Sequence, residues 1–133
     1  MGTLIDSSVL IAWERDQLDL EMKLADQAHE DFAISAITAS ELLHGVYRAK
    51  TAAQRSRREA FVEGLLLRLP IISFDPVSAR VHARLSAELA LKGTPVGAHD
   101  LIIAATAMAK AYVVATRDER SFPKISGLLL HRW

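Results

Sequence analysis

Cysteine is absent from the sequence. Without it the chain can form neither disulfide bonds nor thiolate metal sites. The absence fits a reducing compartment, because disulfides are rare there. Any metal ion that this protein binds must therefore be held by oxygen or nitrogen ligands.

The chain also has no net charge and no long apolar run. Lys and Arg together number 16, as do Asp and Glu, so the formal net charge is zero. This excludes the overall basic field of many nucleic-acid binders, and any contact with nucleic acid would have to use local patches. No apolar run approaches the ~18 residues of a membrane span, and the first residues do not resemble a signal peptide. We expect a soluble, cytoplasmic protein that makes no membrane contact.

The apolar content that is present is sufficient for one hydrophobic core. The chain has 133 residues, of which 50% are hydrophobic. This length is typical of one globular domain. The sequence therefore predicts a single domain that spans residues 1–133.

Short apolar segments alternate with longer amphipathic segments along the chain. The predicted strands are 4–5, 32–35, 71–73 and 112–116, and the predicted helices are 9–14, 18–30, 38–49, 50–69, 76–89 and 98–111. Segment 77–89 alternates apolar and polar residues as a strand would, but its length, its alanines and its apolar residues four apart predict a helix. Strands that alternate with helices predict an α/β fold with a mainly parallel sheet covered on both faces.

The stretch Leu4-Ile5-Asp6-Ser7-Ser8 is an apolar run that stops at a carboxylate and two hydroxyls. A buried parallel strand ends in this way, and ligands of open α/β sheets bind beyond the carboxyl ends of the strands. Asp6 is therefore a candidate site residue. The alternative is that Asp6 only caps the following helix, because Asp is a preferred N-cap residue.

Asp6 is one of four acids at such junctions, and the others are Glu41, Asp100 and Asp118. Each has an ordinary explanation, because acids in a first helical turn complement the dipole and Glu41 would complete a capping box with Thr38. Parallel strands nevertheless bring these junctions to one edge of the sheet, where carboxylates repel one another unless protonated or bridged by a cation. Mg²⁺ prefers oxygen ligands and often binds substrate phosphates as well. The pattern therefore favours a phosphodiester hydrolase.

Four motifs contain these acids and follow one another along nearly the whole chain. They are Leu4-Ile5-Asp6-Ser7-Ser8-Val9-Leu10-Ile11, Ile37-Thr38-Ala39-Ser40-Glu41-Leu42-Leu43-His44-Gly45, Gly97-Ala98-His99-Asp100-Leu101-Ile102-Ile103-Ala104-Ala105 and Ala115-Thr116-Arg117-Asp118. In this order they resemble the PIN-domain ribonucleases, in particular the toxins of VapBC toxin-antitoxin pairs. The resemblance implies a three-layer α/β/α sandwich, dependence on Mg²⁺ or Mn²⁺, and cleavage of RNA to 5′-phosphate and 3′-hydroxyl ends. It also implies inhibition by a cognate VapB-like antitoxin, and dimers are common among relatives.

The same resemblance assigns roles to the acids. Asp6, Glu41, Asp100 and Asp118 match the family's catalytic and metal-binding acids. A metal held by Asp6 and Asp100 would lower the pKa of a bound water, which Glu41 would orient or deprotonate. Asp118 would be a further ligand or would support the other ligands.

Several neighbours of the acids also match the family. Ser8 and Thr116 match hydroxyls that support the acidic cluster. Arg117 either binds the scissile phosphate or is an exposed turn arginine without a role. Ser121 departs from the pattern, because many relatives carry an acid or a histidine there, and this puts a second metal position in doubt.

Two other functions are compatible with parts of this pattern. A haloacid-dehalogenase-like enzyme would use Asp6 as nucleophile, but such enzymes need a second Asp where this chain has Ser8. A degenerate domain that only binds RNA or antitoxin would not need all four acids. His44 and His99 adjoin site residues, but we expect both to be structural or solvated.

Two surfaces are predicted to meet partners. An antitoxin would lay an apolar segment near Leu10, Trp13, Leu18 and Leu20, with Trp13 as a partly exposed anchor. The basic half of the predicted helix 50–69 is the strongest positive patch, and it contains Arg55, Arg57 and Arg58. Its ordinary explanation is a solvated helix face.

Overall fold

The centre of the molecule is a sheet of five parallel strands. The computed structural model describes residues 1–133, and its strands are β1 (Gly2–Ile5), β2 (Asp31–Ser35), β3 (Ile71–Ile72), β4 (Val113–Thr116) and β5 (Leu130–Arg132). The strand order is β3-β2-β1-β4-β5, and all four pairs are parallel. Strand β1 therefore lies in the middle, with β2 and β4 on either side.

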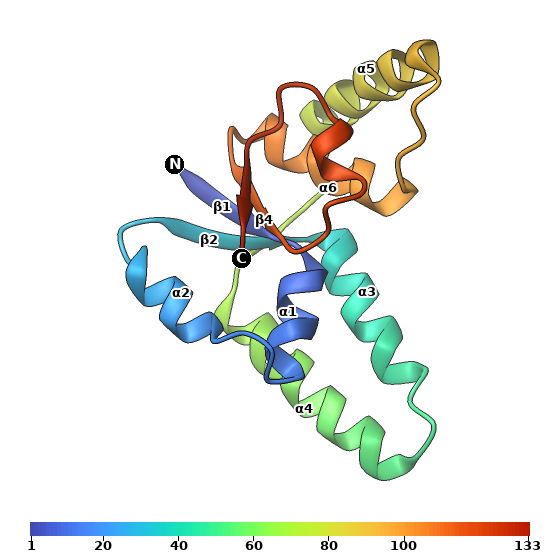
Figure 1. Cartoon of the computed structure of the whole chain (residues 1–133). Helices are drawn as coiled ribbons and strands as arrows, with labels where there is room; N and C mark the ends of the chain where they lie inside the picture. The colour runs from blue at the N-terminus through green and yellow to red at the C-terminus, as the bar shows by residue number, and fades with distance from the viewer.

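Helices cover both faces of this sheet. They are α1 (Ser7–Glu14), α2 (Leu20–Asp26), α3 (Ala36–Tyr47), α4 (Ala52–Arg68), α5 (Pro76–Lys92), α6 (Ala98–Ala109) and the short 3₁₀ helix η1 (Phe122–Lys124). Figure 1 shows α5 and α6 on one side of the sheet and α1, α2 and α4 on the other. The predicted three-layer α/β/α architecture with a parallel sheet is confirmed. None of the helices combines the length and apolar character that crossing a membrane requires.

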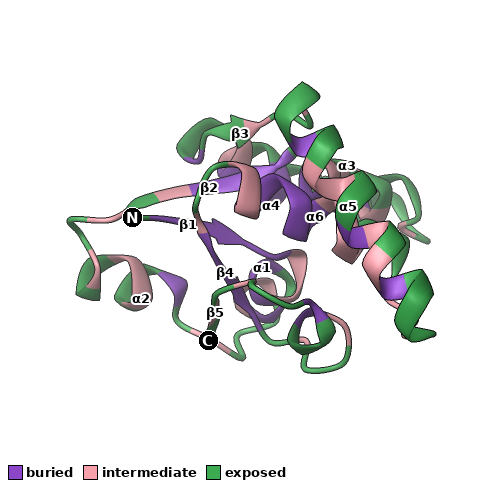
Figure 2. Ribbon diagram, turned by 90° about the horizontal axis from the view of Figure 1, so that it is seen from above, coloured by how far each residue is buried: buried purple, intermediate pink, exposed green.

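Two hydrophobic clusters form the core, one on each face of the sheet. Side chains alternate along a strand, so Leu4 packs with α5 and α6 whereas Ile5 packs with α1 to α4. Both residues are fully buried. Figure 2 shows the buried strands β1 and β4 between helices whose outer surfaces are exposed. Burial on both faces explains why these strands read as uninterrupted apolar runs.

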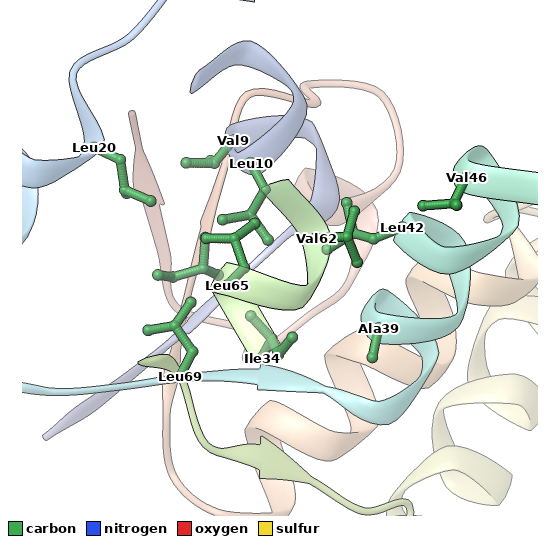
Figure 3. Packing of buried hydrophobic residues seen from close by; sticks show 11 residues of the cluster. Val9, Leu10, Leu20, Ile34, Ala39, Leu42, Val46, Val62, Leu65 and Leu69 are labelled. Atoms are coloured by element: carbon green, nitrogen blue, oxygen red, sulfur yellow. The ribbon is translucent and has the colours of Figure 1, made fainter. Parts of the chain in front are cut away.

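The cluster beside α1 joins three helices that are distant in sequence. Leu10 of α1, Leu42 of α3 and Val62 of α4 are all buried there. Figure 3 shows these side chains meeting between the helices, above Ile34 of β2. This packing fixes the start of α1 and of α3 relative to the central strands.

The start of α3 differs from the sequence prediction. Ser35, not Thr38, is the N-cap residue, and its hydroxyl accepts a hydrogen bond from the Thr38 backbone N–H at 3.1 Å. The predicted capping box between Thr38 and Glu41 is therefore wrong. The strand ends one residue before the helix begins, so the first hydroxyl available is the one that caps. Glu41 consequently lies in the second turn, free of any capping role.

Two other helices differ in how well they were predicted. Helix α5 is confirmed over the ambiguous segment, with Asp75 as its N-cap and Gly93 at φ 61° ending it. Helix α2 is shorter than the predicted 18–30, because it begins after the Asp19 cap and ends at Asp26. The four residues that precede β2 form turns instead of helix.

Candidate active site

The predicted site residues lie at the carboxyl edge of the sheet. Asp6 directly follows the central strand β1, Glu41 is in α3 after β2, and Asp118 comes two residues after β4. Asp100 is the third residue of α6. Figure 1 shows the starts of α1 and α3 side by side at this edge. The parallel topology thus brings residues from four parts of the chain toward Asp6.

Asp6 is buried and held by two hydroxyl groups. Ser8 Oγ donates to Asp6 Oδ2 at 2.6 Å, and Thr116 Oγ1 donates to the same oxygen at 3.0 Å. The Ser8 backbone N–H also donates to Oδ2, at 3.4 Å, which makes Asp6 the N-cap of α1. Asp6 therefore caps the helix and also lies close enough to Glu41 and Asp100 to raise their pKa values, while its role in a reaction stays a prediction. All three bonds end on Oδ2, so Oδ1 remains the oxygen available to a ligand.

The same two hydroxyls connect Asp6 to the loop after β4. Because each hydroxyl gives its one hydrogen to Asp6, its oxygen is left to accept. Ser8 Oγ accepts from the Arg117 backbone N–H at 3.0 Å, and Thr116 Oγ1 accepts from the Asp118 backbone N–H at 2.9 Å. Ser8 and Thr116 thus hold Asp6 against the loop after β4, and their predicted role in supporting the acids stays a prediction.

Glu41 is a half-buried carboxylate with an unpaired oxygen. Its Oε1 is buried and has no hydrogen-bond partner, whereas Oε2 lies 3.4 Å from Nδ1 of His99. Burial raises the pKa of Glu41, the charges of Asp6 and Asp100 raise it further, and the contact with His99 opposes the rise. A buried acceptor without a donor costs free energy unless a ligand or water completes it.

Asp100 is in a similar environment. Burial raises its pKa, as do the charges of Asp6 and Asp118, while a hydrogen bond from the Ser121 hydroxyl opposes the rise. The carboxylate also lies close to the glycine at the start of α6. A Cβ atom on Gly97 would lie 3.1 Å from Asp100 Oδ2, which is tighter than an ordinary van der Waals contact, so the carboxylate would have to shift by a few tenths of an ångström.

The four acids form one electrostatic cluster but not a finished metal site. Asp6 acts on both Glu41 and Asp100, and Asp118 acts on Asp100. No group of three or more His, Asp or Glu side chains is arranged so that it could hold a metal ion. When the four acids are ionised and no cation is bound, their like charges repel one another and destabilise the cluster. The cluster can therefore accept a proton and can attract a hard cation.

The side chain of Arg117 is bound to the last residue of the chain. Its NH1 donates to the backbone oxygen of Trp133 at 3.0 Å, so its guanidinium is held at the end of β5. Asp118 is likewise engaged, because its Oδ1 accepts from the Arg120 backbone N–H at 2.8 Å. A phosphate contact by Arg117 stays a prediction.

Two residues lie beside the acids although sequence analysis assigned them no such role. His99 was expected to be structural or solvated, and its side chain is 55% exposed, but its Nδ1 also lies 3.4 Å from Glu41 Oε2. Ser121 appeared only as a departure from the family pattern, yet it bonds Asp100. The position of His99 next to Asp100 was a usable signal, whereas nothing local to Ser121 indicated its contact.

Comparison of the sequence with known families gives one match that covers nearly the whole chain. The PIN domain profile matches residues 3–128. The tRNA(fMet)-specific endonuclease VapC of Salmonella typhimurium is 39% identical over 100 residues, which are 75% of this chain and 74% of that protein. Ribonuclease VapC1 of Rickettsia felis is 33% identical over 129 residues, 96% of this chain and 93% of that protein.

Solved structures share the same architecture. VapBC2 from Rickettsia felis, bound to a DNA fragment from its promoter, contains a chain that superposes with a TM-score of 0.90 at 26% identity, covering 100% of this chain and 99% of that one. DNA-bound VapBC from Salmonella typhimurium contains one with a TM-score of 0.89 at 30% identity, covering 98% and 97%.

Proposed function

Because this chain belongs to the PIN-domain family, we propose that it is a metal-dependent endoribonuclease that acts as the toxin of a toxin-antitoxin pair. The observation that carries the proposal is the gathering of Asp6, Glu41, Asp100 and Asp118 at one sheet edge, with a buried Glu41 oxygen that lacks a partner. The relatives above are named as ribonucleases or endonucleases, and they match this chain over most of its length.

The acidic cluster fits a hard divalent cation, Mg²⁺ or Mn²⁺. Its donors are all carboxylate oxygens, and the pKa values of Glu41 and Asp100 are raised in part by neighbouring acids. A cation would remove that repulsion and would complete the unpaired oxygen of Glu41. Mg²⁺ usually keeps several waters and takes one or two carboxylates, so two of the acids are enough to bind it directly. Asp6 and Asp100 would hold it, assisted by Glu41 and Asp118.

Different residues of the site have different roles in the proposed reaction. A bound cation supplies a water of lowered pKa and neutralises charge on the phosphate. Glu41 accepts the proton of the attacking water, and its raised pKa makes it a stronger base than an ordinary glutamate. Ser8 and Thr116 keep Asp6 in one orientation throughout, because both of their hydrogens are committed to it.

Water attack in line at phosphorus defines the products. The ribose 2′-hydroxyl takes no part, and the 3′-oxygen is the leaving group. Fragments therefore carry 5′-phosphate and 3′-hydroxyl ends. A histidine-based ribonuclease would instead leave a 2′,3′-cyclic phosphate and would work in EDTA.

The test is cleavage of RNA by the purified protein, with Glu41→Gln as the variant and Glu59→Gln as its matched control. Glu59 is exposed on α4 and makes no ion pair. Loss of a general base lowers kcat by about 10²- to 10⁴-fold. Wild-type cleavage that persists in EDTA, or a Glu41→Gln variant with normal kcat, would contradict the mechanism.

The two alternative functions fare differently. Membership of the PIN family overturns the haloacid-dehalogenase-like assignment of Asp6 as nucleophile. A degenerate, non-catalytic domain predicts RNA or antitoxin binding with no cleavage at all, which the same assay detects.

The predicted antitoxin surface needs a correction at Leu10. This residue is fully buried in the core and lines no cavity at this surface, so a partner does not cover it. An apolar cavity of about 260 Å³ lies beside α2, and its lining includes the predicted residues Trp13 and Leu20 together with Leu24 and Phe32. We place the apolar segment of a VapB-like antitoxin there, since the solved relatives are toxin-antitoxin complexes. A homodimer stays a prediction.

This docking surface can be tested by co-expression with the neighbouring gene. Leu24→Lys should abolish co-purification of the partner and restore the growth arrest that the toxin causes alone. Met22→Lys is the matched control, because Met22 is on the same helix and 60% exposed. Equal co-purification of both variants would contradict the placement.

A further inference from the structure

A cavity of about 500 Å³ lies between α1, α3 and α4 and adjoins the acidic cluster. Glu41 is one of its lining residues, so the cavity and the cluster share a side chain. Its floor is apolar, because the buried residues Leu42 and Val62 also line it. Figure 3 shows these two side chains meeting between α3 and α4. The cavity has the size of an ordinary ligand site.

The charge of this cavity is opposite to that of the cluster beside it. Its lining contains four permanent cations, Arg15, Arg48, Lys50 and Arg58. Only two acids line it, namely Glu14 and Glu41. The chain as a whole has no net charge, so this excess of positive charge is local. We call this surface, defined by the four cations, the cationic groove.

None of the four cations is neutralised within the protein. No carboxylate oxygen lies within 4.0 Å of any of them, whereas five other Lys and Arg side chains do form ion pairs. Arg58 is held in place, because its NH1 donates to the backbone oxygen of Gly45 at 3.0 Å. Arg48 and Lys50 are exposed at the rim. Unpaired cations around one hollow favour an anionic occupant.

We propose that the cationic groove binds phosphates of the RNA strand next to the bond that is cleaved. This inference rests on the proposed ribonuclease function, and it assigns these cations to the substrate. Arg58 positions one phosphate through its fixed guanidinium, and Arg48 and Lys50 contribute mobile charges. Phosphate contacts set the affinity and the register of a strand but carry no sequence information. The groove therefore leads the RNA backbone to Glu41 regardless of sequence.

The experiment compares two double variants with equal loss of charge. Arg48→Gln with Lys50→Gln alters the rim of the groove. Arg80→Gln with Lys92→Gln is the control, because both residues are exposed on α5, which packs on the opposite face of the sheet. Binding of a labelled single-stranded RNA is measured by fluorescence anisotropy in EDTA over a range of salt concentrations.

The groove variant should bind RNA roughly tenfold more weakly at low salt, and its slope of log Kd against log salt should fall by about 1.4, or about 0.7 per lost phosphate contact. The control should keep the wild-type slope. In cleavage assays with Mg²⁺, the groove variant should raise KM and keep kcat, whereas Glu41→Gln lowers kcat.

Failure of this inference is distinct from failure of the proposed function. Wild-type protein that cleaves RNA, together with a groove variant of unchanged affinity and salt slope, overturns the inference alone. Wild-type protein that neither binds nor cleaves RNA overturns both. A groove variant that binds RNA normally but no longer binds the co-expressed antitoxin shows a protein-binding surface, and this also overturns the inference.

Discussion

Asp6→Asn and Asp100→Asn should stop the same reaction but shift the stability of the metal-free protein in opposite directions. Asp6 accepts two hydroxyl hydrogen bonds on one buried oxygen. Loss of a charged acceptor costs about 1.5–3 kcal/mol, and relief of repulsion with the other acids offsets about 0.5–1 kcal/mol. The net loss is about 1–2 kcal/mol, which lowers Tm by about 3–8 °C.

At Asp100 the destabilising effects of burial and repulsion outweigh the hydrogen bond at neutral pH. Its pKa is raised, so its ionised form destabilises the fold, and the stability of the wild type falls as pH rises through that pKa. The asparagine removes this penalty and gains up to about 1 kcal/mol, or about 2–5 °C, after screening by solvent. Below the raised pKa the wild-type carboxyl is already neutral, so the gain should disappear in acid.

The assay is thermal unfolding in EDTA at neutral and at acidic pH, combined with RNA cleavage in Mg²⁺. Both variants should be inactive. A rise in Tm for Asp6→Asn, or a fall for Asp100→Asn at neutral pH, would refute the reasoning, because it would reverse the balance between hydrogen bonding and repulsion at that residue. A gain for Asp100→Asn that persists in acid would refute the assignment of its cause.

Three further predictions concern neighbouring features. Gly97→Ala should reduce cleavage modestly with little change in Tm, because the new Cβ shifts the Asp100 carboxylate by a few tenths of an ångström while φ −56° and ψ 141° suit alanine; steady-state kinetics test this. Asp75→Ala should lower Tm at neutral pH, because the Ser78 backbone N–H lowers the pKa of Asp75. This stabilisation is fully present above the ordinary pKa of aspartate and is lost only as the pH falls through the lowered pKa, so the difference in Tm should shrink in that acid range; a pH series of melting curves tests this. RNA fragments should be ligatable through 5′-phosphates without kinase treatment, and cyclic-phosphate ends formed in EDTA would contradict the metal assignment.

The sequence predicted the fold well because its signals were local. Apolar runs without alternation predicted buried parallel strands, and the structure buries both Leu4 and Ile5 completely. The ambiguous segment 77–89 was assigned correctly because length and spacing favoured a helix. The capping box at Thr38 and Glu41 failed because Ser35 offered the same chemistry three residues earlier. When two nearby residues could both cap a helix, the end of the preceding strand determines which of them becomes the N-cap.

Contacts between distant segments were less accessible to sequence reasoning. The approach of Asp6 and Thr116 followed from parallel topology and was expected, whereas the bond between Ser121 and Asp100 depends on the path of the loop after β4. Burial was also misjudged at the N-terminal helices. Leu10 looked like a partner contact, but it belongs to the core cluster that Val62 and Leu65 of α4 complete, a long-range effect that no local pattern contains.

The arrangement of charge solves a problem that any nuclease of neutral net charge faces. A phosphodiester is an anion, and the four acids repel it as well as one another. A cation in the cluster cancels this repulsion only at the bond to be cut, and it does nothing for the phosphates on either side. The cationic groove beside Glu41 attracts those phosphates, and its cations have no carboxylate partners that would compete. The cations of the groove therefore attract the RNA strand, whereas the acidic cluster cleaves one bond. Salt should weaken RNA binding, and EDTA should abolish cleavage without abolishing binding.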